Sequence, residues 1–125
     1  MTTSTVVKVS AAIEAATAVG LIVVPNLVAR LLLGTEFSTG GIATARVAGF
    51  ALLSLAIACW PHQGDAAYAA TRGLFVYNLL VALYFAYLGA SGTFFTYLLW
   101  VACAVHALLG LLLARPAYTK APAQS

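Results

Sequence analysis

Four long apolar stretches, separated only by short polar segments, occupy almost the whole chain of 125 residues. A helix that crosses a bilayer needs about 20 mostly apolar residues. The chain is 63% hydrophobic and 7% charged, whereas an average soluble domain has about 25% charged residues. A soluble domain of this length could not bury so much apolar surface, because small domains keep much of their surface in water. The sequence therefore predicts an all-α membrane protein.

Prolines, glycines and short polar segments separate the apolar stretches and set the expected helix boundaries. We predict transmembrane helices at about residues 6–24, 42–60, 66–88 and 93–114. The connections are short, and short connections make consecutive helices antiparallel neighbours. The predicted fold is therefore an antiparallel four-helix transmembrane bundle.

Two prolines refine these boundaries. A proline suits the first position of a new helix, so Pro25 predicts a short amphipathic helix over residues 25–33. This helix would lie in the membrane interface or form a bent extension of the first span. Pro116 is predicted to end the last span. We therefore expect one transmembrane domain over residues 1–116 and a disordered tail over residues 117–125.

The net charge is +3, but the basic residues form no run, which argues against a nucleic-acid partner. They lie singly near the expected helix ends, where cations reach lipid headgroups, so membrane lipids are the expected partners. With four spans, both termini lie on one side of the membrane. That side carries four basic residues and the other side two: Lys8, Arg72, Arg115 and Lys120 against Arg30 and Arg46. This bias predicts that both termini are cytoplasmic.

Glu14 is one of three acidic residues and lies inside the first apolar stretch. An ionised carboxylate is costly there, so Glu14 should face protein and either pair with a cation or hold a proton. Arg72 is the predicted partner, because it lies at a similar depth from the same side, whereas Arg46 enters from the opposite side. Glu14 then serves as a static ion pair, has a proton- or ligand-coupled role, or faces a water-filled cleft. Beside it runs a small-residue ladder for close helix packing: Ala12, Ala16 and Gly20.

Three more polar side chains are predicted inside the bundle. Asn78 should link helices by hydrogen bonds, and the hydroxyl of Tyr77 should find a partner there. His106 is open to three interpretations: a hydrogen-bonded core residue, a ligand-pocket residue, or a haem or metal ligand. No cluster of His, Cys, Asp and Glu has metal-ligand spacing, so no cofactor is predicted. Cys59 and Cys103 lie on different predicted helices, and we expect no disulfide between them.

The sequence contains no recognised catalytic signature, which favours a non-enzymatic role. The segment AAIEAATAVG resembles the first helix of the small multidrug resistance transporters, four-span chains with one essential carboxylate in that helix. This resemblance implies a proton-coupled exporter of small molecules that works as a dimer through Glu14. The third span, RGLFVYNLLVALYFAYLG, departs from that family because it lacks a glycine-rich dimerisation stretch.

A second resemblance covers the segment after the first span and much of the other three spans. The segments that carry it are VPNLVARLLLG, ARVAGFALLSLAIACW, RGLFVYNLLVALYFAYLG and LLWVACAVHALLGLLLAR. They are similar to small bacterial four-span proteins of a loosely DoxX-like kind. The resemblance implies a left-handed antiparallel bundle in a bacterial inner membrane. It implies no activity, because a fold alone does not define a function.

We therefore expect a small, multi-pass inner-membrane protein with a non-enzymatic role. It would bind a lipidic or small apolar molecule, or act as an accessory subunit, as a homodimer or within a larger membrane complex. The alternative is a proton-coupled exporter that works as a dimer through Glu14. The residues expected to face the interior and carry the function are Glu14, Arg46, Arg72, Tyr77, Asn78 and His106.

Overall fold

The computed structural model describes residues 2–60, 65–94 and 96–119, and the described part is helical without strands. The elements are α1 (Thr3–Val23), α2 (Pro25–Leu33), α3 (Thr39–Ala58), α4 (Asp65–Ala90) and α5 (Tyr97–Tyr118). Four of them, α1, α3, α4 and α5, are long and apolar enough to cross a membrane. This confirms the predicted all-α, four-span architecture of a multi-pass membrane protein. The predicted short helix after the first span is α2.

Side-chain caps fix the starts of three helices. The hydroxyls of Thr2, Ser38 and Thr96 accept hydrogen bonds from backbone N–H groups one turn further on, at the starts of α1, α3 and α5. Such caps satisfy N–H groups that have no partner inside the helix. The predicted start of the fourth span near residue 93 is therefore four residues early, because the capping hydroxyl is that of Thr96.

The predicted end of the fourth span at Pro116 is wrong, since α5 continues through this proline to Tyr118. A proline near a helix end removes only one backbone hydrogen bond, and packing of the last turn offsets the loss. Ala117 is fully buried, and the ring of Tyr118 packs edge-to-face on that of Phe75 at 5.6 Å between centroids. The predicted tail begins inside this helix, and residues 120–125 lie outside the described residues.

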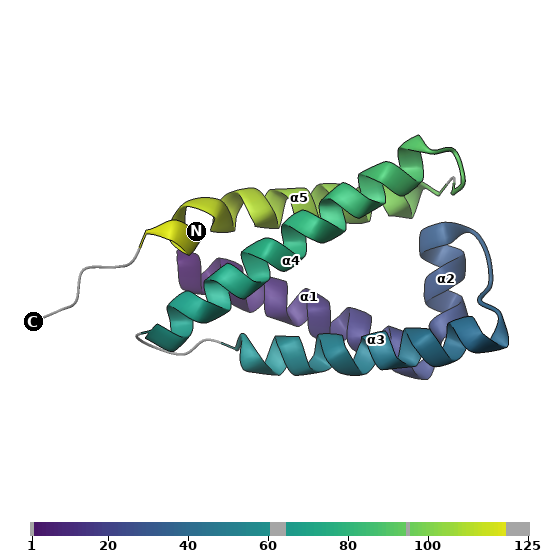
Figure 1. The fold of residues 1–125 in the computed structure, drawn as a ribbon, viewed down its shortest axis with the longest axis horizontal. Helices are drawn as coiled ribbons and strands as arrows, with labels where there is room; N and C mark the ends of the chain where they lie inside the picture. Colours follow the sequence, from purple (N-terminus) through teal and green to yellow (C-terminus); the bar gives the residue numbers. More distant parts are fainter. Residues whose placement is uncertain (1, 61–64, 95, 120–125) are drawn as a thin grey trace, which may run out of the picture.

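The helices form two antiparallel pairs, α1 with α3 and α4 with α5 (Figure 1). The pairs meet mainly where α1 contacts α4 and α5. In the described part of the chain, the backbones of α3 and α4 make few close contacts, although the two helices meet where Cys59, at the end of α3, packs against Ala70. The bundle is therefore less evenly packed than the prediction of consecutive neighbours implies. The start of α1 and the end of α5 lie at the same end of the bundle (Figure 1).

The α1–α3 pair packs closely at Gly49. A Cβ atom at this position would lie 2.8 Å from Cγ1 of Ile22 and 2.9 Å from the backbone oxygen of Ala18. The predicted small-residue ladder does not make this contact, because Ala12 and Ala16 are exposed. The buried alanines of α1 are instead Ala11 and Ala18.

The short helix α2 is a separate helix across one end of the bundle rather than a bent extension of α1 (Figure 1). Val24, between the two helices, has a non-helical backbone conformation. At the other end of α2, Gly34 has a φ of 71°, which glycine adopts at little cost. The side chain of Asn26 accepts a hydrogen bond from the Phe37 backbone at 3.0 Å, which holds the following loop against α2.

Candidate functional site: a membrane cavity above a polar layer

The bundle interior changes character along its length. On α5, the buried leucines Leu109 and Leu113 belong to an apolar core near the chain termini. His106 follows one turn nearer the opposite end, and Ala102 and Leu98 then line a cavity. The same order of core, polar layer and cavity is found along α1 and α4. The polar layer therefore separates a packed end of the bundle from a hollow one.

Asn78 is the centre of the polar layer and joins three helices. It is fully buried, and its Nδ2 donates to Oγ of Ser10 on α1 at 2.9 Å and to the backbone oxygen of Leu74 at 2.8 Å. Its Oδ1 lies 2.8 Å from Nδ1 of His106 on α5. The bonds to Ser10 and His106 are the interhelical bonds expected for Asn78. Each such bond in a membrane protein contributes about 0.6 kcal/mol on average.

This network also fixes the proton on His106. The backbone oxygen of Leu74 can only accept, so the Asn78 atom facing it must be the amide nitrogen. The Asn78 atom facing His106 is then the carbonyl oxygen, which also only accepts. Nδ1 of His106 therefore carries a proton and donates it to Asn78. In the neutral ring, Nε2 is left with a lone pair.

Glu14 lies beside this network but does not join it. Its side chain is 0% exposed, and neither carboxyl oxygen has a hydrogen-bond partner of normal geometry among the described residues. Oε1 lies 3.9 Å from Nδ1 of His106, and the hydroxyl of Tyr77 is close enough to interact with the carboxyl group. Glu14 is therefore enclosed as predicted, with two polar neighbours and no cationic partner among the described residues.

The predicted partner Arg72 is wrong, as is the interior position of both Arg46 and Arg72. Both arginines are exposed. Arg72 lies over the ring of Tyr68, at 5.8 Å from the centroid, and Arg46 donates to the backbone oxygen of Ile22 at 3.3 Å. Each arginine is about 10 Å from the start of its helix, so its long side chain can reach the membrane surface. The depth of Arg72 along its helix therefore did not predict an ion pair with Glu14, because depth does not give the direction in which a side chain points.

Replacing Glu14 by glutamine should leave the unfolding temperature in detergent within about 2 °C of the native value, or raise it. Glutamine keeps the shape of the side chain, and no buried cation loses a partner. A buried ion pair would behave differently, because removing one partner costs about 3–5 kcal/mol. A loss of many degrees in Glu14→Gln would contradict this account. Glu14→Ala, which leaves a cavity, shows that the assay can detect destabilisation.

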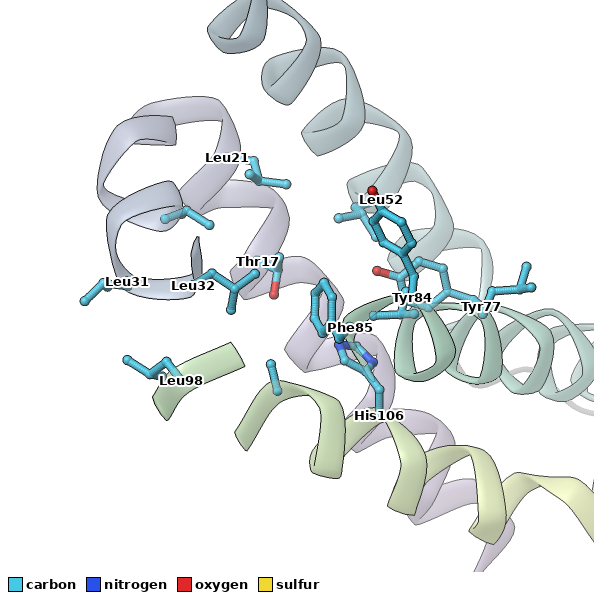
Figure 2. A pocket seen from close by; sticks show the side chains of 14 residues that line it. Thr17, Leu21, Leu31, Leu32, Leu52, Tyr77, Tyr84, Phe85, Leu98 and His106 are labelled. Carbon is cyan, nitrogen blue, oxygen red and sulfur yellow. The ribbon is translucent and has the colours of Figure 1, made fainter. Parts of the chain in front are cut away.

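A cavity of about 640 Å³ lies between the two helix pairs, beyond the polar layer. Most of the 14 lining residues are aliphatic or phenylalanine. Only four carry a polar group: Thr17, Tyr77, Tyr84 and His106. In Figure 2 the rings of His106 and Phe85 lie together on one side, with leucines of α2 and α5 on the other. Edge-to-face contacts at 5.9 Å hold the His106 ring against both Tyr77 and Phe85.

The cavity reaches the outer surface of the bundle beside α4. Leu80 and Tyr84 line it, yet these residues are 60% and 59% exposed. Leu52 lines it from α3, whose backbone makes few close contacts with α4 in the described part of the chain. The cavity therefore opens on the outer surface of the bundle.

Sequence patterns predicted that His106, Tyr77, Asn78 and Glu14 face the bundle interior, but they did not indicate the cavity. In the structure His106 and Tyr77 line it, and Asn78 and Glu14 lie next to it. Its leucines look like any lipid-facing residues of an apolar helix. Among the described residues, no group of three His, Cys, Asp or Glu side chains could hold a metal ion. Cys59 and Cys103 are free thiols.

Comparisons of the chain with protein-family models, with curated proteins and with solved structures found no match. We therefore argue the function from the cavity and the polar layer.

Proposed function

We propose that the protein binds a lipidic or small apolar molecule inside a bacterial inner membrane and catalyses no reaction on it. The observation that carries this proposal is the cavity of about 640 Å³ with its mostly apolar lining. Sites for small molecules are typically about 300–1,000 Å³ and mainly apolar, with a few polar groups that fix orientation. At roughly 30 Å³ for each water-sized group, this cavity has room for on the order of 20 non-hydrogen atoms.

The surrounding structure suits binding better than chemistry. The hydrogen bonds of Asn78 and the flanking aromatic rings hold His106 in one orientation, so a bound molecule meets a preformed wall. A preformed site loses little entropy on binding. The gap between α3 and α4 supplies a route from the lipid phase.

The proposal predicts that the purified protein retains an apolar molecule. Native mass spectrometry from a mild detergent should detect the chain with one added mass, which organic extraction removes. The same spectrum reports whether the chain is a monomer, a homodimer or an accessory subunit of a larger complex. If the purified chain carries no added mass and takes up none when apolar probes of about 20 non-hydrogen atoms are supplied, the binding role is refuted.

The proton-coupled exporter has less support from the geometry. Such a mechanism needs the carboxyl group of Glu14 to meet water or substrate, as well as to bind and release a proton. Glu14 is 0% exposed and is not among the residues that line the cavity. We therefore favour binding, with Glu14 as part of the wall behind the cavity.

A further inference from the structure

Hydrogen positions in the cavity wall restrict what the cavity can bind. Thr17 lines the cavity, and its hydroxyl donates to the backbone oxygen of Ile13 at 3.0 Å. A hydroxyl has one proton and two lone pairs. With its proton committed to Ile13, the Thr17 oxygen offers only a lone pair to a molecule in the cavity.

His106 offers a lone pair in the same way. Its Nδ1 proton is donated to Asn78, which leaves Nε2 as an acceptor. Among the described residues, Nε2 makes no hydrogen bond, yet it is not enclosed. Among these residues, the only fully buried side-chain nitrogen or oxygen atoms without a hydrogen-bond partner are the two carboxyl oxygens of Glu14. Nε2 of His106 is therefore not fully buried. His106 lines the cavity and its other ring nitrogen is taken up by Asn78, so Nε2 is the ring atom that can accept a hydrogen bond from a bound molecule.

We propose that the occupant is an apolar molecule with a hydroxyl group at one end, and that this hydroxyl donates a hydrogen bond to Nε2 of His106. This inference rests on the proposed binding function and adds the chemical class of the ligand. The apolar body fills the space lined by leucines of α2, α3 and α5, while the hydroxyl meets the polar layer. A molecule that can only accept hydrogen bonds would place a second lone pair against Nε2 and Thr17. The donors left to it are the hydroxyl of Tyr77, which lies beside Glu14, and that of Tyr84 at the cavity edge.

The test compares two probes of nearly equal size, para-dodecylphenol and its methyl ether, by native mass spectrometry of the full chain after its own ligand is extracted. The phenol should bind about threefold to tenfold more tightly, which is the usual net effect of one hydrogen bond. Equal binding of the two probes would overturn the hydroxyl inference and leave the binding function intact. If neither probe binds, the proposed function itself fails.

Two variants identify the acceptor. In His106→Phe the preference for the phenol should disappear, and a preference that persists would overturn the role of His106. In Tyr84→Phe, which removes another hydroxyl from the cavity edge, the preference should remain; its loss would assign recognition to Tyr84 instead. Because His106 also bonds to Asn78, its variant can fail to fold. The comparison of probes on the native chain needs no variant and keeps the inference testable.

Discussion

Ala102→Trp is expected to weaken binding of an apolar ligand by at least about tenfold. Ala102 is half-buried on α5 and lines the cavity, so an indole ring there takes up space that the ligand needs. Forcing extra atoms into a filled, close-packed site usually costs about 1–3 kcal/mol, and 1.4 kcal/mol corresponds to tenfold in affinity. In the empty protein, the same ring fills a void and should not lower the unfolding temperature.

The matched control is Ala104→Trp, two residues further along the same helix. Ala104 is exposed and does not line the cavity, so its variant should bind as the native protein does. Native mass spectrometry of both variants, supplied with the same apolar probe, provides the comparison. Equal loss of binding in both variants, or in neither, would contradict the position of the site.

Gly49→Ala is expected to destabilise the protein by about 1–3 kcal/mol, through strain between α1 and α3. The added methyl group would lie 2.9 Å from the backbone oxygen of Ala18 and 2.8 Å from Ile22. The backbone cannot give way as the end of a flexible side chain can. The two helices must therefore move apart along their closest contact, although alanine is the better helix former.

Gly73→Ala is the control for Gly49→Ala, because it makes the same change inside another helix, α4. Apart from the nearby backbone of its own helix and its two chain neighbours, no described atom lies within 4 Å of the position that its Cβ would occupy. Alanine there should stabilise the helix by about 0.5–1 kcal/mol. Unfolding in detergent should therefore shift in opposite directions in the two variants. Destabilisation of equal size in both would mean that close packing at Gly49 is not the cause.

The helices were predictable because the length and polarity of each apolar stretch determine whether it can span a bilayer. The burial of Asn78 and His106 was predictable for a related reason, since polar groups in a membrane span must face protein. The continuation of α5 through Pro116 was not predictable, because the packing of Tyr118 on Phe75 offsets the lost hydrogen bond. Sequence patterns describe single helices and do not contain this contact.

The pairing of helices and the cavity depend on side-chain directions and fit, which the periodicity of one helix does not fix. The ladder of Ala12 and Ala16 illustrates this, since these two alanines are exposed while Ala11 and Ala18 are buried. Arg72 illustrates it as well, because its depth suited Glu14 while its side chain lies against Tyr68. The cavity lies where α4 diverges from α3 (Figure 1), and this divergence is a property of the whole bundle.

The central claim is that an apolar molecule leaves the lipid phase and occupies the cavity. A long-chain alcohol with a photoreactive diazirine, incorporated into vesicles with the protein, tests it when the labelled residues are mapped by mass spectrometry. We predict that labels concentrate on half-buried cavity residues such as Leu21 and Leu32 and are sparse at Leu111, which is 75% exposed on the outer face of α5. Labelling that follows exposure to lipid, strong at Leu111 and absent from Leu21 and Leu32, would contradict the account.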